Sequence, residues 1–372
     1  MDEVRVHQCV DDLDDPQWDW AVGGSVFASV GWLRTVETHY RGGLTPFYIS
    51  VWRDDQLVGG AVSYLFRQSD EIETPDDVLF GRTKQLMNGV GFSALPMLVC
   101  GTVFGNSTPV FADNQLGQPD RLSVFAQAIA AVEQLGDEQG VRVSFLHILD
   151  SDQLLREALG QRDYLVARDV PYAVMDVGWN SYDGYLDHLP KKHRKEFQRQ
   201  SNRNQGSETS IETVVNLGDL EAEFAALADL NSVKHNCRPF AFREGFFGTV
   251  KWNLAEQAQL YRASKGAAST GVCLTIRSET EAFTTVVGVD RSAGDDFTYF
   301  ELTYRFPIAV AAARKLERVH YARAMYEVKR RRGCRFVGAT HYYRPVGWRR
   351  YLMKLWLALL SARNERTMRL IG

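Results

Sequence analysis

The feature that most constrains the fold is an order of elements that occurs twice along the chain. In each half, helical segments come first, antiparallel strands follow, and a further helix and strand complete the series. The elements do not alternate strictly between strand and helix, so the pattern predicts an α+β fold rather than a parallel α/β fold. The repeat lies in the order of elements, because no repeat of individual residues is visible.

The first half contains an amphipathic helix and a hairpin. Residues 27–40 have helical periodicity, with Ser29 as the expected N-cap. Residues 47–52 and 57–66 are predicted strands, joined by a polar turn, and Gly59 followed by Gly60 indicates a bulge. Further elements of this half are predicted as a helix over 121–139 and strands over 141–148 and 170–177.

The second half starts near residue 175 with polar helical sequence. Its predicted elements are a helix over 182–203, strands over 260–264, 271–277, 282–289 and 297–304, a helix over 306–316, a strand over 338–343 and a C-terminal helix over 346–363. We therefore expect three parts. Residues 1–175 form the first domain, 176–345 form the second with the active site, and 346–372 form a C-terminal helix and tail.

Charge is distributed unevenly, although the net charge of -3 indicates no partner. Residues 2–77 contain 15 acids against 5 bases, and residues 314–354 contain 13 bases against 2 acids. Such asymmetry is typical of a chain with one basic face for an anion such as phosphate or nucleic acid. Ordinary solvated helix faces are the alternative, and both interpretations stay open here.

The 5 cysteines and the apolar segments bear on the compartment. No C-x-x-C pair occurs, and the spacings match neither a disulfide framework nor a zinc site. The start of the chain lacks the features of a signal peptide, and no apolar run reaches the roughly 18 residues of a membrane span. We expect reduced thiols, a cytoplasmic location and no integral membrane segment; the sequence does not indicate the oligomeric state.

A basic stripe is the first candidate binding element. Lys191, Lys195, Arg199 and Arg203 recur every four residues, which places them along one side of a helix. Like charges at this spacing repel by a few tenths of a kcal/mol per pair, and a bound anion would remove that cost. A solvated helix that tolerates the repulsion is an equally good interpretation.

The second candidate is the segment 299–334. As a strand it would present Tyr299, Glu301 and Thr303 on one face. Glu301 among aromatic residues could be partly buried and act as a general base, or it could pair with an arginine. Lys329 lies in a basic run that ends at Gly333, where it could stabilise negative charge on a tetrahedral centre.

Motifs of other enzyme classes are missing from the sequence. His235, His320 and His341 have no metal-binding spacing, so no metal site is expected. No G-x-S-x-G, Walker or G-x-G-x-x-G element occurs, which argues against serine hydrolase, P-loop and dinucleotide chemistry.

Together these segments resemble the FemAB/FemX-like acyltransferases of the GNAT superfamily. Residues 189–214 are similar to the basic helix and strand that open the second half of these enzymes, and 297–334 to their closing unit. Residues 27–37 and 47–65 are similar to the first helix and hairpin. The resemblance covers most of the chain, and the order of the pieces carries more weight than any single piece.

The resemblance implies two GNAT-like domains, each a mixed, mostly antiparallel sheet flanked by helices. It implies transfer of an activated acyl carbon to an amine, with no cofactor and with the acceptor end of aminoacyl-tRNA as donor, in peptidoglycan or specialised-metabolite biosynthesis. Lys329 matches the lysine of the closing motif, near the reaction centre. Residues expected to bind substrate are Lys191, Arg194, Lys195, Arg199, Arg203, Tyr299, Tyr304, Tyr326 and Arg332.

The sequence departs from the family pattern in two ways, and these departures leave alternative functions open. The sequence lacks a clean Q/R-x-x-G-x-G/A loop for the pyrophosphate of coenzyme A, and the nearest string, 203–208, ends in the wrong residue. No coiled-coil arm is visible, so the amine acceptor could be a small molecule as well as a peptide. The alternatives are an acyl-CoA- or carrier-protein-dependent N-acyltransferase and a non-catalytic pair of GNAT domains that binds RNA or a metabolite.

Overall fold

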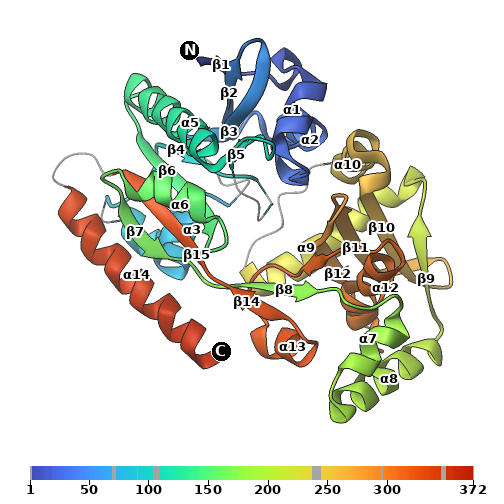
Figure 1. Ribbon diagram of the computed structural model, residues 1–372. Helices are drawn as coiled ribbons and strands as arrows, with labels where there is room; N and C mark the ends of the chain where they lie inside the picture. Colours follow the sequence, from blue (N-terminus) through green and yellow to red (C-terminus); the bar gives the residue numbers. More distant parts are fainter. Residues whose placement is uncertain are drawn as a thin grey trace. The chain divides into compact units, whose positions relative to one another are not determined.

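The computed structural model describes residues 2–68, 73–89, 91–103, 105, 109–236, 244–292, 294, 296–344 and 349–371. The chain forms two compact units (Figure 1). Unit 1 comprises Met1–Pro171 together with Val337–Gly372, and unit 2 comprises Tyr172–Phe336. The expected division assigned residues up to 345 to the second domain, whereas the structure returns the chain to unit 1 at Val337.

Unit 1 is a mixed sheet covered by helices. Its strands are β1 (Glu3–His7), β2 (Thr45–Arg53), β3 (Gln56–Phe66), β4 (Met97–Cys100), β5 (Val110–Ala112), β6 (Arg142–Leu149), β7 (Leu165–Arg168) and β15 (Ala339–Arg344). Its helices are α1 (Asp15–Val22), α2 (Val30–Tyr40), α3 (Pro75–Phe80), α4 (Lys84–Gly89), α5 (Gln118–Glu138), α6 (Gln153–Gly160) and α14 (Arg349–Ile371).

The predicted first helix and hairpin are confirmed. Helix α2 starts after Ser29, whose hydroxyl accepts the backbone N–H of Trp32. Strands β2 and β3 pair around a turn in which Asp54 and Asp55 both have positive φ, as a tight two-residue hairpin turn requires. The register shifts between Val51 and Trp52, beside the two glycines of β3. A Cβ atom on Gly60 would lie 2.1 Å from the carbonyl oxygen of Ile49, so this position has no room for a side chain.

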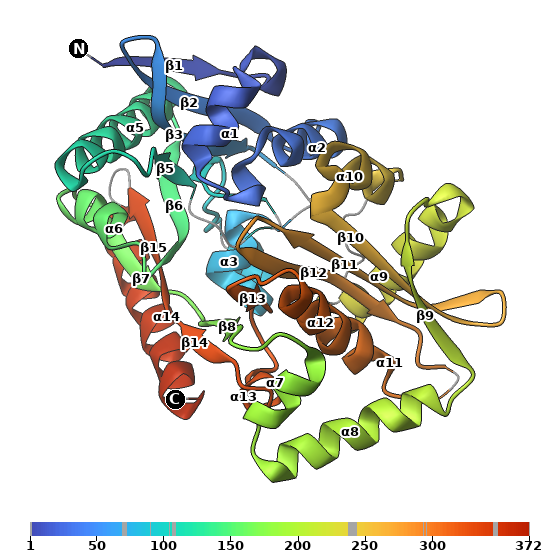
Figure 2. The same cartoon turned by 45° about the vertical axis from the view of Figure 1, so that its right-hand side comes forward.

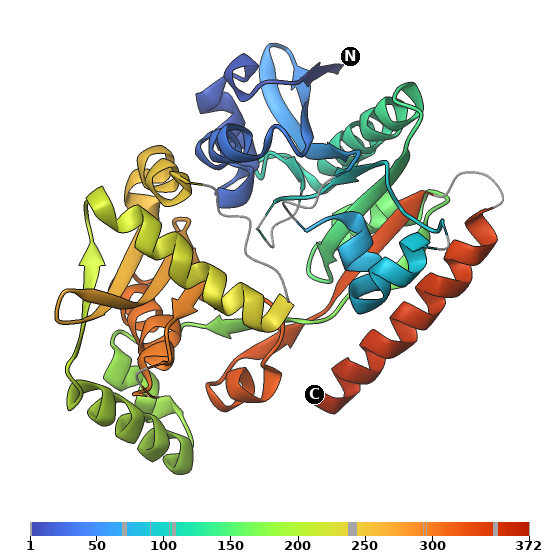
Figure 3. The ribbon, with the colours of Figure 1, turned by 180° about the vertical axis from the view of Figure 1, so that it is seen from behind.

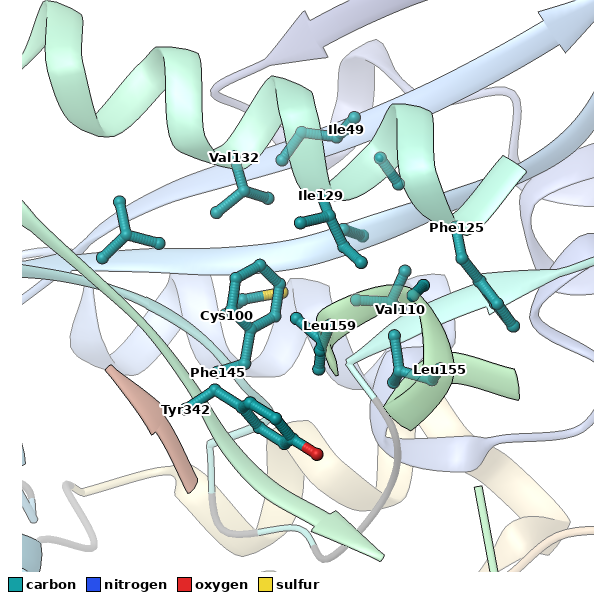
Figure 4. Packing of buried hydrophobic residues seen from close by; sticks show 14 of the residues in the cluster. Ile49, Cys100, Val110, Phe125, Ile129, Val132, Phe145, Leu155, Leu159 and Tyr342 are labelled. Carbon is teal, nitrogen blue, oxygen red and sulfur yellow. The ribbon is translucent and has the colours of Figure 1, made fainter. Parts of the chain in front are cut away.

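The core of unit 1 lies between the sheet and α5 (Figure 4). Ile129 and Val132 of α5 point toward Phe145 of β6, and Leu155 and Leu159 of α6 close the same cluster. All are buried, because apolar residues recur at helical spacing on α5 and α6 and at alternate positions on the strands.

Unit 2 is built on a second sheet. Its strands are β8 (Tyr172–Asp176), β9 (Thr209–Val214), β10 (Ala258–Lys265), β11 (Ala268–Arg277), β12 (Glu281–Val289), β13 (Arg318–His320) and β14 (Arg335–Val337). Its helices are α7 (Tyr182–His188), α8 (Lys191–Gln205), α9 (Glu221–Asn236), α10 (Phe246–Leu254), α11 (Thr298–Phe300), the π-helical turn η6 (Glu301–Arg305), α12 (Phe306–Ala313) and α13 (Tyr326–Arg331).

The two sheets have the same strand order. The main path in unit 1 is β1-β2-β3-β4-β6-β15-β7, and in unit 2 it is β9-β10-β11-β12-β13-β8-β14. In each, an antiparallel meander is followed by a helix and a parallel strand, β6 beside β4 or β13 beside β12. The strand next to the far edge comes last along the chain in unit 1, as β15, and first in unit 2, as β8. The predicted α+β class, with two mostly antiparallel sheets flanked by helices, is confirmed.

Two predicted elements are wrong. The predicted strand over 297–304 is helical, because α11, η6 and α12 follow one another without a break (Figure 2). Tyr299, Glu301 and Thr303 therefore do not share a strand face. The predicted helix over 182–203 is two helices, α7 and α8, separated at Pro190, where the proline ring disfavours helical backbone for the preceding residue.

Residues 346–348, the start of the predicted C-terminal helix, lie outside the described residues, and α14 continues past the predicted end at 363. Among the described helices, none has the length and apolar character needed to cross a membrane.

Candidate functional site

Helix α8 is attached to the rest of unit 2 by its polar buried side. Gln200, Ser201 and Asn204 are buried together with Phe197, although the helix as a whole is strongly polar. The amide of Asn204 donates to Thr298 Oγ1 at 3.2 Å. These contacts fix which side of α8 faces solvent.

Glu301 is one of the polar partners of α8. Its carboxylate is buried, and Oε1 accepts the hydroxyl of Ser201 at 2.6 Å. Oε2 accepts Nη1 of Arg305, one helical turn on, at 2.9 Å. Glu301 thus pairs with an arginine, as one of the two interpretations expected, and its role as a general base stays a prediction. Both carboxylate oxygens have donors, so the residue ties α8 to η6.

Arg332 forms the second link to α8. Its guanidinium lies 4.2 Å from the ring centre of Phe197 and 4.4 Å from those of Phe300 and Tyr304. Nη2 donates to the buried side-chain oxygen of Gln200 at 3.0 Å. A planar guanidinium can stack on aromatic faces and still donate along its edge, which an ammonium group cannot do in the same way.

Lys329 faces the loop that follows β13. Its ammonium donates to the backbone carbonyls of Tyr321, Ala322 and Arg323, the last at 2.8 Å. Burial lowers the pKa of Lys329 to about 8. Ala322, and Ala324 and Met325 beyond it, have positive φ, which costs free energy in residues other than glycine. Lys329 therefore anchors α13 to a strained loop.

The four lysines and arginines of the predicted stripe face solvent. Lys191, Lys195, Arg199 and Arg203 are all exposed. The guanidinium of Arg203 lies 5.3 Å from the ring centre of Phe297. Arg194 points toward the end of α7, where it donates to the Asp187 carboxylate at 3.0 Å.

The tyrosines expected to bind substrate lie in three different settings. The Tyr299 hydroxyl contacts Met325 Sδ at 3.6 Å, and burial raises the pKa of Tyr299. Tyr304 is buried with its ring 4.9 Å from that of Tyr321. Tyr326 packs edge-on against Phe336. Tyr304 also contacts Arg332, whereas Tyr326 lies on α13.

A pocket of about 300 Å³ lies between α8 and α13. Its walls are Lys192, His193 and Glu196 from α8 and Glu327, Arg330 and Arg331 from α13. Sequence reasoning missed this face of α8, which is adjacent to the predicted stripe. Residues 192, 193 and 196 have the spacing of one helix face, which the sequence already showed. This face could be recognised as part of a pocket only once α13 was placed beside α8.

The pocket contains both charge signs. Three cations, Lys192, Arg330 and Arg331, face two carboxylates, Glu196 and Glu327, which leaves one positive charge with histidine neutral. Glu327 accepts Arg331 at 3.0 Å and Arg330 at 2.6 Å, and these arginines lower the pKa of Glu327. The site is thus suited to a ligand that has an anionic and a cationic group.

The segment after β12 matches the arginine and first glycine of the pyrophosphate-binding pattern, as residues 203–208 do, and it also differs from the pattern at the last position. Residues 291–296 read R-S-A-G-D-D and precede helix α11. Asp296 stands where the pattern has a small residue. Its carboxylate accepts Thr298 Oγ1, Thr209 Oγ1 and Lys265 Nζ, and its pKa falls to about 2, because these contacts outweigh burial. An ionised carboxylate at this place repels a phosphate.

Unit 1 holds a group of the kind that can ligate a metal ion. Ligand atoms of His147, Asp169 and His341 all lie within 4.8 Å of one another. However, Nδ1 of His341 accepts the backbone N–H of His147 at 3.1 Å, so neutral His341 carries its proton on Nε2, which lies 3.2 Å from Asp169. Hydrogen bonds therefore account for this cluster. Its members are too far apart in sequence for spacing to reveal them.

Comparison with known proteins gives one family match. The family model FemAB-like, described as peptidoglycan biosynthesis/recognition, matches residues 9–358. No curated protein matches the chain.

Solved structures share the fold at low sequence identity. FemX has a TM-score of 0.60 at 10% identity, over 94% of this chain and 99% of its own. A C-terminal domain assigned to a lysylphosphatidylglycerol synthetase from Agrobacterium fabrum has a TM-score of 0.56 at 12% identity, over 95% and 97%. L-PGS from Bacillus licheniformis has a TM-score of 0.52 at 12% identity, over 88% and 96%.

Proposed function

Because the chain belongs to the FemAB-like family, we propose that it is an N-acyltransferase that uses aminoacyl-tRNA as donor. The nitrogen of an amine attacks the ester carbonyl carbon of the donor. A C–N bond forms, the C–O bond to the terminal ribose breaks, and the ribose hydroxyl leaves with the proton that the amine gives up. The acceptor is an amine of a peptidoglycan precursor or of a small metabolite, and a tRNA donor would place the reaction in the cytoplasm.

The pocket between α8 and α13 carries the proposal. An aminoacyl donor and an amine acceptor together bring phosphate and ammonium groups to one place, and the pocket offers Lys192 and Arg331 beside Glu196. Its volume of about 300 Å³ is at the lower end of small-molecule sites. We assign Lys192 and Arg331 to the anionic donor and Glu196 to the amine.

Aminoacyl-tRNA is favoured over acyl-CoA by the loop after β12. A pyrophosphate of coenzyme A placed before α11 would meet the Asp296 carboxylate, which stays ionised above pH of about 2. The name of one structural neighbour, lysylphosphatidylglycerol synthetase, denotes an aminoacyl product, which agrees with an aminoacyl donor.

Lys329 and Glu301 enter the proposal as positioning residues. Lys329 sets the loop 321–325 and with it the position of α13, one wall of the pocket. Glu301 sets the position of α8, the other wall, through Ser201. Either side chain would need to leave its present partners before it could touch a reacting atom.

The donor class is tested by incubation with a mixture of charged tRNAs and a set of amines, before and after ribonuclease treatment. Amide formation that ribonuclease abolishes is the expected result. Formation that survives ribonuclease and requires acyl-CoA would identify the rival donor. Binding of tRNA without turnover for any amine would favour the non-catalytic alternative.

The pocket is tested by reversing one charge on each face of α8. Lys192→Glu is expected to raise the KM for aminoacyl-tRNA at least ten-fold and to reduce the salt dependence of binding, because one phosphate contact is lost. Lys195→Glu is the matched control on the outer stripe of the same helix, and little change is expected. An equal loss in both variants would assign donor binding to the stripe instead of the pocket.

A further inference from the structure

Helix α14 lies along β7 of unit 1 (Figure 3). It has two apolar sides, one buried and one exposed. Met353 and Leu357 are buried, and Trp356 donates its indole N–H to the carbonyl of Leu79 at 3.0 Å. The Asn364 amide donates to the carbonyl of Arg168, the last residue of β7, and the Ser361 hydroxyl accepts the backbone N–H of Arg168. These contacts fix the rotation of the helix about its own axis.

The opposite side of α14 exposes large apolar side chains. The exposed fractions are 78% for Tyr351, 47% for Leu352, 63% for Leu355 and 59% for Leu359. Residues 351, 355 and 359 are four apart and residue 352 is adjacent, so the four form one continuous stripe. Single exposed apolar residues are common on protein surfaces, but a contiguous stripe usually marks an interaction surface.

The same side is basic toward the C-terminal end of the helix. Arg363, Arg366 and Arg369 extend the stripe in that direction, and Lys354 lies beside the stripe. Within the described part of the chain, none of these four side chains forms an ion pair. Glu365 is the one acid in α14. The surface therefore combines apolar side chains with unneutralised positive charge.

The apolar and basic side chains distinguish between two partners that could cover the exposed side of α14. A second copy of the chain would bring the same bases against these ones, with Glu365 as the one acid of α14 to offset them. A bilayer that contains anionic lipids offers phosphate groups at the level of the arginines and hydrocarbon at the level of the leucines. Charge complementarity therefore favours the bilayer.

We propose that α14 docks the protein on the surface of an anionic lipid bilayer. The helix lies in the plane of the interface, with Leu355 and Leu359 at the acyl boundary and Arg363, Arg366 and Arg369 among the phosphates. Each basic side chain near such a surface strengthens binding by roughly five-fold. The attachment is reversible, weakens as salt rises, and does not depend on the proposed acyl transfer.

Sedimentation with lipid vesicles tests the proposal on the full chain. The protein should pellet with vesicles of mixed phosphatidylglycerol and phosphatidylcholine and stay in the supernatant with phosphatidylcholine alone. The double variants Leu355→Gln/Leu359→Gln and Arg363→Glu/Arg366→Glu should each lower the partition coefficient at least ten-fold. Trp252→Gln, which changes an apolar side chain 87% exposed on α10, is the matched control and should bind like the natural chain.

Three outcomes would overturn the proposal. They are no binding to either vesicle, equal binding by the leucine double variant, and a dimer in sedimentation equilibrium that the leucine double variant dissociates without any vesicle binding. Unchanged thermal unfolding of the variants shows that a loss of binding is not a loss of fold. Failure of the ribonuclease test with intact vesicle binding would reject the proposed donor and leave this inference standing.

Discussion

Asp169 accepts a hydrogen bond from Nδ1 of His147 at 2.8 Å, and both residues belong to unit 1. The carboxylate is buried and also accepts the backbone N–H of Val170 at 2.7 Å. Burial by itself raises the pKa of Asp169, but His341 and His147 outweigh it, so the pKa lies well below the ordinary value. One buried negative charge thus joins β6, the end of β7 and β15.

The low pKa of Asp169 predicts acid sensitivity. A depressed folded-state pKa contributes stability above the unfolded value of about 3.9, and this contribution is lost as the pH falls below it. Asp169→Asn leaves two imidazoles without their carboxylate and should cost about 3 kcal/mol at pH 7. Urea unfolding at pH 7 and at pH 2.5, below the unfolded pKa, measures both effects. Asp163→Asn, which removes an exposed partner of Arg350, should leave the urea midpoint unchanged.

The lowered pKa of Lys329 likewise predicts that stability rises with pH, but in an alkaline range instead of an acid one. Its folded pKa of about 8 lies below the unfolded value of about 10.4, so the folded protein binds fewer protons between these values. The free energy of unfolding should therefore rise across that interval, by up to about 3 kcal/mol. Lys329→Met should lack the rise when unfolding is measured at pH 7.5 and pH 10. A rise of the same size in the variant would show that other groups cause it.

The hydrogen bond between Arg332 and Gln200 should couple the two side chains in the free energy of unfolding, and a lysine at position 332 should not restore this coupling. Arg332→Met should destabilise unit 2 by about 2 kcal/mol, because it leaves the Gln200 oxygen buried without its donor. Arg332→Lys should restore little, since an ammonium cannot stack on Phe197 and Phe300 in the same way. A double-mutant cycle with Gln200→Leu should give a coupling of about 1 kcal/mol. Additive effects would mean that the hydrogen bond contributes nothing.

Position 288 in β12 should not tolerate a side chain. A Cβ atom there would lie 2.1 Å from the carbonyl oxygen of Leu227, where the backbone of α9 passes over the strand. Gly288→Ala should cost about 3 kcal/mol, because backbone on one side must move. Gly160 in α6 has open space around it, so Gly160→Ala should stabilise slightly through helix propensity. Thermal unfolding of the two variants in parallel distinguishes overpacking from a general effect of alanine.

Local patterns predicted much of the fold. The hairpin of β2 and β3 was readable because alternating apolar residues surround a polar turn, and both signals act within about 20 residues. Ser29 was readable as an N-cap, since a hydroxyl beside the first turn satisfies a donor that the helix leaves unpaired. The repeated order of elements likewise anticipated two similar halves, each with its own sheet.

The segment around Glu301 shows where local patterns fail. Its aromatic residues favour a strand, yet the same residues place Glu301 and Arg305 four apart, which suits a helix. In the helical conformation Glu301 also accepts the hydroxyl of Ser201 from α8. No local rule weighs a contact between residues that lie a hundred positions apart.

The sequence alone determined the fold class, the family resemblance and the basic character of α8, because these depend on periodicity, composition and order. Tertiary structure alone decided which residues meet. It placed β15 in the sheet of unit 1, joined His341 to Asp169, and brought Lys192 of α8 and Arg331 of α13 to one pocket. The physical reason is that burial and pairing depend on distances between elements, whereas a sequence pattern reports only neighbours along one element.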